Sequence, residues 1–216
     1  MKNFKAVIFD LDGTLLNTID DLSDAVNYML NEFGYPTHTV EDYKLKVGNG
    51  MPKLMERALP IGHKTQEEID RALSVFMPYY NAHKMDKTAP YEDILKLLTV
   101  LKEKNLKIAV VTNKAHSAAV PLVREVFPDV FDCVTGLKDG ANAKPAPDSV
   151  FETLKTLGVN ADESIFVGDS SVDMLTAKNA GCFALGVLWG FRSADELLKN
   201  GADRLISKPM ELLELL

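Results

Sequence analysis

The chain has 216 residues, of which 46% are hydrophobic and 25% are charged, values that are ordinary for a globular protein. This length is sufficient for one large domain or for a domain that carries an insertion. The 24 basic and 31 acidic residues give a net charge of −7, which disfavours non-specific binding to nucleic acid or to an anionic membrane surface.

No segment has the pattern of a secretion signal or a membrane span. Lys5 interrupts the amino-terminal stretch, and the longest apolar stretch, residues 182–191, contains two glycines and is too short to cross a bilayer. Cys133 and Cys182 lie far apart in apolar segments, so we expect reduced core residues and neither a disulfide framework nor a zinc site. These features predict a cytoplasmic protein, a monomer or homodimer, that binds neither nucleic acid nor membranes.

The first predicted strand, residues 6–9, is followed at once by the segment D-L-D-G-T, which contains Asp10, Asp12 and Gly13. Side chains at positions i and i+2 of a strand point to the same side. The carboxyl ends of strands in an open α/β sheet form the crevice where ligands bind. Two anions there require a cation between them, or a proton kept on one of them for acid–base work. The alternative is a solvated turn with an aspartate at each corner.

Residues 17–83, which follow the first predicted strand, have a wholly helical pattern. Apolar residues at helical spacing precede Gly34, a residue typical of helix ends; they are Leu22, Val26, Met29, Leu30 and Phe33. Thr65 followed by Glu68 predicts a capping box before a second long helix. We therefore expect a catalytic core of residues 1–16 and 84–216, with a helical cap domain of residues 17–83.

After residue 90, short β-branched runs alternate with helical patterns, which is typical of βαβ units and a parallel sheet. The expected strands are residues 107–112, 133–135, 164–168, 183–187 and, more weakly marked, 204–206. One helix between them should end at Gly158. The predicted fold class is α/β, with a Rossmann-like parallel sheet flanked by helices and an inserted all-helical cap.

Two later strand ends carry groups that suit phosphate. Thr112 and Asn113 offer a hydroxyl, an amide and free N–H groups, although Thr112 alone has the alternative of capping the next helix. Lys144 precedes Pro145, which restricts it to an extended conformation and makes it a fixed point charge for a phosphoryl group. The alternative for Lys144 is an ordinary solvated loop lysine.

The strand at residues 164–168 ends in an acidic motif that contains Asp169, Ser170 and Asp173. Asp169 would complete an oxygen-rich site with Asp10 and Asp12, and such a site suits Mg²⁺. Asp173, together with Ser170, would orient Lys144 or a metal-bound water through hydrogen bonds, as a second layer around the site. The alternative for Asp173 is an acid in the first helical turn, favoured by the helix dipole.

Four strand ends that carry D-x-D-G-T, T-N, K-P and G-D-S-x-x-D in this order resemble the haloacid dehalogenase superfamily of phosphatases. The match covers essentially the whole chain and is similar to the subgroup whose helical cap is inserted between the first and second motifs. Within that subgroup, several segments look like those of the phosphoglycolate phosphatases: V-G-N-G at 47–50, E-R-A-L at 56–59, V-T-N-K at 111–114, L-W-G-F at 188–191 and G-A-D at 201–203.

The resemblance implies a mechanism for this chain. Asp10 would attack phosphorus and form an aspartyl phosphate, and Asp12 would act as the acid and then the base. Mg²⁺ would be held by Asp10, by Asp169 and by Asp12, which in the family lends its backbone carbonyl and so leaves its carboxyl free for the acid–base role. The residues expected to hold the phosphate are Gly13, Thr112, Asn113 and Lys144.

The expected function is Mg²⁺-dependent hydrolysis of a small phosphorylated metabolite, with 2-phosphoglycolate as the first candidate. In the cap, Gly48, Asn49 and Gly50 form a turn whose backbone can approach a ligand. Arg57 is expected to meet a substrate carboxylate, with an ordinary surface residue as the alternative. A pyrophosphatase, a sugar-phosphate phosphatase or a β-phosphoglucomutase on the same core stays open, as does a non-catalytic module for phosphate sensing or interaction.

Overall fold

The computed structural model describes residues 3–216, and the chain divides into two compact units. The first unit comprises the residues up to Leu16 together with Pro90–Leu216, and the second comprises Asn17–Ala89. The chain thus returns to the first unit at Pro90 rather than at the expected residue 84. The reason is that Asp21 accepts hydrogen bonds from the backbone N–H groups of Lys87 (3.0 Å) and Thr88 (2.8 Å), which ties this segment to the second unit.

The first unit contains a parallel sheet whose strands, within residues 3–216, run in the order β5-β4-β1-β6-β7-β8. These strands are β1 (Ala6–Phe9), β4 (Lys107–Ala115), β5 (Cys133–Leu137), β6 (Ser164–Gly168), β7 (Phe183–Val187) and β8 (Arg204–Ile206). All the expected strands are present, and the predicted α/β fold class is confirmed. Because β1 lies between β4 and β6, the chain order reverses beside it, and ligands bind at such points in open α/β sheets.

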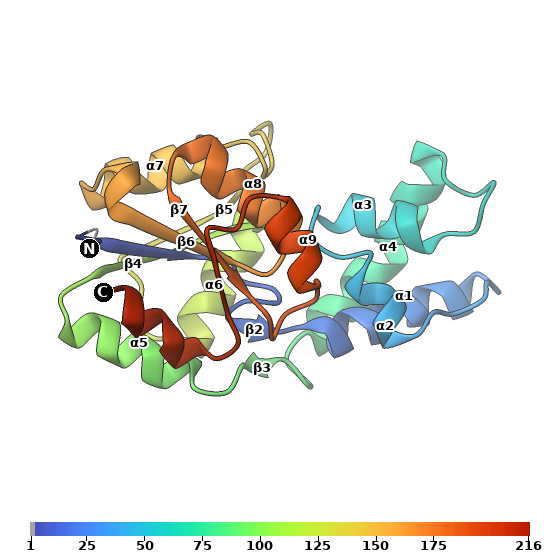
Figure 1. The fold of residues 1–216 in the computed structure, drawn as a ribbon. Helices are drawn as coiled ribbons and strands as arrows, with labels where there is room; N and C mark the ends of the chain where they lie inside the picture. The colour runs from blue at the N-terminus through green and yellow to red at the C-terminus, as the bar shows by residue number, and fades with distance from the viewer. Residues whose placement is uncertain (1–2) are drawn as a thin grey trace. The chain divides into compact units, whose positions relative to one another are not determined.

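Helices cover both faces of this sheet. They are α5 (Ile94–Glu103), α6 (His116–Val126), α7 (Asp148–Leu157), α8 (Ser171–Ala180) and α9 (Ala194–Lys199), with short 3₁₀ segments η1 (Ala161–Glu163) and η2 (Pro209–Leu215). Figure 1 shows α7 and α8 on one face of the sheet and α5 on the other. Ile8 pairs in register with Ala109 and Phe166, and these side chains form the core beneath α7 and α8.

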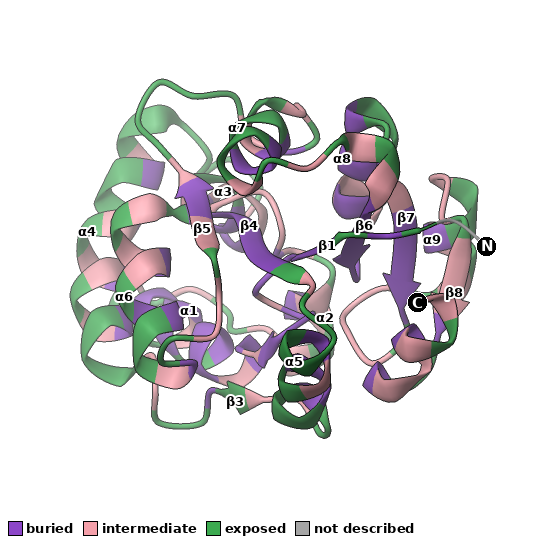
Figure 2. Cartoon of the chain, turned by 90° about the vertical axis from the view of Figure 1, so that its left-hand side faces the viewer, coloured by how far each residue is buried: buried purple, intermediate pink, exposed green. Residues whose placement is uncertain are grey.

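The central strands are the most deeply buried part of the sheet, as Figure 2 shows in purple. Every residue of β1 and β6 is buried. Each large apolar side chain that leaves water in this way contributes about 1.5–3 kcal/mol to folding. The core therefore gives the carboxyl ends of these strands a rigid base.

The second unit is helical, with α1 (Ile19–Glu32), α2 (Val40–Lys44), α3 (Met51–Ala58) and α4 (Gln66–His83). α1 ends just before Gly34, which has φ +71°, and Thr65 and Glu68 form the predicted capping box of α4. The short strands β2 (Leu16–Asn17) and β3 (Ala89–Pro90) pair where the chain leaves and re-enters the first unit. None of the helices in the described part of the chain is long and apolar enough to cross a membrane.

Two details differ from the sequence-based expectations. β4 continues past Thr112 to Ala115, and its pairing with β5 shifts register between Val111 and Ala115. Both cysteines are free, as expected, but Cys133 is only half-buried whereas Cys182 lies in the core.

Candidate active site

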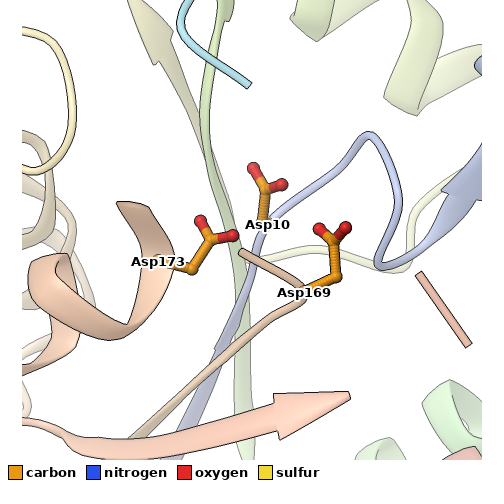
Figure 3. Close-up of side chains that lie close together, drawn as sticks. All are labelled: Asp10, Asp169 and Asp173. Atoms are coloured by element: carbon orange, nitrogen blue, oxygen red, sulfur yellow. The ribbon is translucent and has the colours of Figure 1, made fainter. Parts of the chain in front are cut away.

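Three carboxylates meet at the carboxyl ends of β1 and β6. Asp10 follows β1, Asp169 follows β6, and Asp173 lies in the first turn of α8. One oxygen from each lies within 4.8 Å of the others, and all three residues are buried. Figure 3 shows the three side chains pointing to the same side of the strand ends. Segments more than 150 residues apart along the chain, such as Thr14 and Asp169, meet here.

The Lys144 ammonium group lies between two of these acids. Its Nζ donates to Asp10 Oδ1 (2.7 Å), to Asp173 Oδ1 (2.7 Å) and to the Val111 carbonyl (3.2 Å). The three contacts account for all three N–H donors of the group, and the side chain is only 3% exposed. Burial works against the charged form, but the two carboxylates outweigh it, so the pKa of Lys144 lies above its ordinary value. Lys144 is thus a fixed cation and not a solvated loop lysine.

Asn113 holds the backbone of Lys144 in place. Its side-chain amide donates to the Lys144 carbonyl (3.1 Å), and its Oδ1 accepts from the Lys144 N–H (2.8 Å). The side-chain amide thus positions the lysine, and the predicted contact of Asn113 with phosphate stays a prediction. This positioning is possible because the loop before the cis Lys144–Pro145 peptide passes directly beside the end of β4.

Asp173 combines the two roles that the sequence left open. Its Oδ1 holds Lys144, and its Oδ2 accepts from the Ser170 hydroxyl (2.6 Å) and the Ser170 N–H (3.1 Å). The Ser170 hydroxyl in turn accepts from the Asp173 N–H, which completes a capping box at the start of α8. The same carboxylate therefore fixes the lysine and stabilises the first turn of the helix.

Asp169 is held by the loop after β7 and by the turn after β1. Its Oδ2 accepts from the Phe191 N–H (2.8 Å), and its Oδ1 accepts from the Thr14 hydroxyl (3.3 Å). A Cβ at Gly13, which has φ +93°, would lie 2.5 Å from Asp169 Oδ2, so only glycine allows this approach. Burial, followed by the charges of Asp173 and Asp10, raises the pKa of Asp169 well above its ordinary value.

Trp189 fastens the same loop, because its indole N–H donates to the Thr14 carbonyl (3.0 Å). The Phe191 contact is made by the backbone N–H, so no side-chain pattern in the sequence could have indicated it.

Asp12 is paired with a residue that the sequence analysis did not single out. Lys114 Nζ lies 3.0 Å from Asp12 Oδ1 and 3.1 Å from Oδ2. The Lys114 N–H also donates to the hydroxyl of Thr112, which is buried. The position of Lys114 two residues after Thr112 on an extended strand was the available signal, because such residues tend to share a side.

The charges at the site fit a divalent cation. Among the described residues, the groups in direct contact are the carboxylates of Asp10, Asp12, Asp169 and Asp173 and the ammonium groups of Lys114 and Lys144. The acids therefore outnumber the cations before any anionic substrate binds. Burial raises the pKa of Asp10 to about 7, although Lys144 opposes the shift. A metal ion would remove this excess negative charge.

The oxygens that are best placed for a metal belong to Asp10 and Asp169. Asp173 lies in the same cluster, but both of its oxygens are already engaged by Lys144 and Ser170. The carboxylate of Asp12 pairs with Lys114 and lies outside this cluster, which agrees with a carboxyl group that is left free for acid–base work. The resemblance assigns Asp12 a backbone carbonyl ligand, and that assignment stays a prediction.

Comparison with known proteins identifies the family of this chain. The profile of the haloacid dehalogenase-like hydrolases matches residues 7–187, which include every acid of the site. The chain belongs to the haloacid dehalogenase-like hydrolase family. The resemblance read from the four motifs is therefore confirmed, and the chain is an enzyme of the hydrolase class.

Several relatives of this hydrolase are named phosphoglycolate phosphatase. A phosphoglycolate phosphatase of Chromobacterium violaceum is 33% identical over 100% of this chain and 98% of its own length. Another, from Pseudomonas syringae pv. tomato, is 36% identical over 87% of this chain and 70% of its own length. A crystal structure from Lactobacillus delbrueckii subsp. bulgaricus, described as a candidate phosphoglycolate phosphatase, is 38% identical and superposes with a TM-score of 0.93, covering 100% of this chain and 98% of that one.

The helical unit of this haloacid dehalogenase-like hydrolase contains the residues predicted to contact substrate. Arg57 donates to the Lys46 carbonyl (2.7 Å) and to Asn49 Oδ1 (2.8 Å). Gly48 and Gly50 have φ +118° and +83°, conformations that glycine adopts readily. The guanidinium group thus braces the turn at residues 48–50 and is not a free surface charge. Contact of these residues with substrate stays a prediction.

Proposed function

We propose that this hydrolase is a magnesium-dependent phosphatase that forms an aspartyl phosphate on Asp10 and that 2-phosphoglycolate is its substrate. The observation that carries the proposal is the buried Lys144 ammonium group, 2.7 Å from both Asp10 and Asp173, with Asp169 in the same cluster. A carboxylate can approach a phosphate dianion only where positive charge offsets their repulsion. Lys144 supplies part of that charge.

Asp10 acts as the nucleophile in the first step. One of its carboxylate oxygens forms a bond to phosphorus while the bond from phosphorus to the substrate oxygen breaks. Phosphate-monoester hydrolysis is among the slowest uncatalysed reactions, with accelerations of up to ~10²¹-fold. In phosphoryl transfer most of the catalysis comes from positioning and electrostatic stabilisation. The fixed ammonium group and the rigid strand ends supply both.

Asp12 acts as the acid and then the base. It donates a proton to the leaving oxygen in the first step and accepts a proton from the water that cleaves the aspartyl phosphate in the second. The products are inorganic phosphate and the substrate's alcohol, and both aspartates return to their starting states. A positioned group of this kind typically contributes about 10²–10⁴-fold.

Asp10 and Asp169 are the residues that would hold Mg²⁺. When bound, the ion supplies positive charge that keeps Asp10 ionised and offsets the charge of the phosphate. The Phe191 N–H and the Thr14 hydroxyl orient the Asp169 carboxylate for this purpose.

The choice of 2-phosphoglycolate is supported by relatives that are 33–38% identical along most or all of the chain. It is also supported by the V-G-N-G turn and by Arg57, which braces it. In this proposal the partner is a small phosphorylated molecule in the cytoplasm. A monomer or a homodimer is expected.

A non-catalytic module for phosphate sensing is disfavoured by the intact set of reactive groups. Such a module has no chemical need for both Asp10 and Asp12. It also has no need for a buried lysine whose three N–H donors all contact Asp10 or groups beside it. A pyrophosphatase, a sugar phosphatase and a β-phosphoglucomutase would use the same core and are separated by their products.

The substitution Asp10→Asn tests the mechanism. We expect phosphate release to fall below detection while the circular dichroism spectrum and the unfolding transition stay native-like, because the amide is a poor nucleophile of nearly the same shape. Rapid acid quench with ³²P-labelled substrate should trap a phosphoenzyme in the natural protein and not in the variant. A folded Asp10→Asn protein with full activity would contradict the mechanism.

A phosphate-release screen tests the substrate. The substrates are 2-phosphoglycolate, pyrophosphate, β-glucose 1-phosphate and p-nitrophenyl phosphate, each with Mg²⁺ and with EDTA. We expect the highest kcat/KM for 2-phosphoglycolate and no release in EDTA. A higher value for pyrophosphate or a sugar phosphate would overturn the substrate assignment but not the mechanism, and isomerisation of glucose 1-phosphate without phosphate release would identify a mutase.

A further inference from the structure

Lys114 is a buried cation that the mechanism above does not use. Its side chain is 2% exposed and that of Asp12 is 15% exposed, and the ammonium group contacts both Asp12 oxygens at 3.0 and 3.1 Å. A buried ammonium group needs a partner because burial without one is strongly unfavourable. Contact with both oxygens also fixes the rotation of the carboxylate, which a single contact would leave free.

The backbone explains why Lys114 reaches this position. β4 runs past Thr112 to Ala115, and the register shift against β5 falls in this stretch. Irregularities of this kind re-aim side chains near active sites. The Lys114 N–H donates to the Thr112 hydroxyl (3.1 Å), so the same residue orients a second group that was predicted to bind phosphate.

The position of Asp12 relative to the acid cluster is informative. Asp12 lies two residues after Asp10, yet within the part of the chain that the structure describes, the carboxylates able to share a metal ion are those of Asp10, Asp169 and Asp173. Carboxylate oxygens are the ligands that Mg²⁺ prefers. A mobile Asp12 carboxylate so close by would be attracted to the ion, and an acid–base group bound to a metal can no longer exchange its proton with the substrate.

We propose that Lys114 is a positioning residue that keeps the Asp12 carboxylate out of the metal cluster and oriented for acid–base work. The inference deepens the proposed function and rests on it, because the acid–base role of Asp12 belongs to that function. Lys114 itself transfers no proton and touches no reacting atom in this scheme. Its effect reaches the reaction only through Asp12.

The test uses Lys114→Met, which keeps the length of the side chain and removes its charge and donors. With p-nitrophenyl phosphate and saturating Mg²⁺, we expect kcat to fall about ten- to a hundredfold, a part of the ~10²–10⁴-fold that a positioned acid–base group contributes. We expect KM to change less than kcat. Lys114→Arg keeps donors that can contact both oxygens and should restore most of kcat.

The second measurement needs no turnover. Isothermal titration of the substrate-free protein with Mg²⁺ should give tighter binding for Lys114→Met than for the natural protein, because the freed Asp12 carboxylate joins the ligands. In the Asp12→Asn background the same Lys114 substitution should leave the Mg²⁺ affinity nearly unchanged. Equal tightening in both backgrounds would show that only the lost positive charge matters and would overturn the proposal.

The control is Lys107→Met on the same strand. Lys107 also lies 3.0 Å from an aspartate, Asp132, but at the amino end of β4 and with half of its side chain exposed. We expect no change in kcat or Mg²⁺ affinity for this variant. Should Lys114→Met fail to fold, Lys114→Gln, which removes the charge but keeps a polar side chain, takes its place in both measurements with the same expected results.

The two proposals fail in distinguishable ways. If the natural protein with Mg²⁺ releases no phosphate from any monoester, the proposed function fails while the titration still reports on Lys114. If phosphate is released and Lys114→Met retains the natural kcat and Mg²⁺ affinity, the positioning role of Lys114 is wrong and the phosphatase assignment stands.

Discussion

At the scale of single residues, Lys144 determines the charge balance around the nucleophile. Its three contacts leave no N–H group without a partner, and its two acidic partners are themselves buried. Removing one partner of a buried ion pair generally costs about 3–5 kcal/mol, because the other charge stays behind uncompensated. The site thus depends on Lys144 for stability as well as for chemistry.

Lys144 is buried between groups of opposite charge, whereas Asp169 is buried among other acids. The hydrogen-bond partners of Asp169 are a neutral hydroxyl and a backbone N–H, and the negative charges of Asp173 and Asp10 act on it more strongly than the positive charge of Arg192. Its raised pKa means that the folded protein binds a proton at a pH where the unfolded chain, with an aspartate pKa of about 3.9, has already lost it. In the metal-free protein this group therefore contributes less stability as the pH rises.

The substitution Asp169→Asn should show this sign directly. In EDTA we expect the free energy of unfolding of the variant to increase relative to that of the natural protein from about pH 5 to about pH 8, so that the variant becomes relatively more stable. Urea unfolding at both pH values measures the difference, and Asp139→Asn, at an exposed loop position, provides the control. A relative stability that is constant, or that falls with rising pH, would contradict the assignment of a raised pKa.

At the scale of elements, two helices begin with the same chemical device in different surroundings. α8 begins at Ser170 with Asp173 as the reciprocal partner, and α4 begins at Thr65 with Glu68. Both caps satisfy backbone N–H groups that would otherwise lack partners at a helix start. Only the cap of α8 also holds a catalytic lysine, because Asp173 Oδ1 contacts Lys144.

This difference leads to a paired prediction. Ser170→Ala and Thr65→Ala should each lower the free energy of unfolding by about 0.5–2 kcal/mol, the usual cost of losing a capping side chain. Ser170→Ala should in addition lower kcat, because Asp173 loses the hydroxyl that orients it, whereas Thr65→Ala should leave kcat unchanged. Urea unfolding and phosphate-release assays measure both quantities, and an unchanged kcat for Ser170→Ala would refute the link between cap and lysine.

At the scale of the whole molecule, a chain with a net charge of −7 is proposed to act on an anion. Its overall field does not attract such a substrate, so the attraction must come from local groups. Those groups are Lys144, Lys114 and the proposed metal ion, gathered at the ends of strands that the sheet holds side by side. The fold therefore concentrates positive charge that the composition as a whole lacks.

Magnesium should stabilise the folded chain by mass action. At about 100 times its Kd, a ligand that binds only the folded state adds about 2.7 kcal/mol. We expect Mg²⁺ to raise Tm in a calorimetric scan, EDTA to reverse the rise, and Asp169→Asn to abolish most of it. The single tryptophan, Trp189, gives a second readout, because its indole donates to Thr14 beside the metal cluster and its fluorescence should change on titration. An unchanged Tm and fluorescence in the natural protein would contradict the metal site.

The sequence by itself determined the strands, the capping box of α4 and the four motifs. Each of these features is encoded by a few neighbouring residues. Examples are an apolar run followed by an acid, a threonine three residues before a glutamate and a lysine before a proline. Local patterns of this kind follow from backbone geometry and from the pairing of adjacent polar groups, so they can be interpreted without knowing what lies opposite.

Only the tertiary structure decided which groups touch. Asp173 joins the acid cluster, Asp12 pairs with Lys114, and Asn113 holds the backbone of Lys144. Asp12 and Lys114 are 102 residues apart, and their contact depends on the pairing of β1 with β4 and on an irregularity in β4. Such contacts arise because the sheet places distant strand ends side by side, and no pattern among neighbouring residues encodes a distance of this kind.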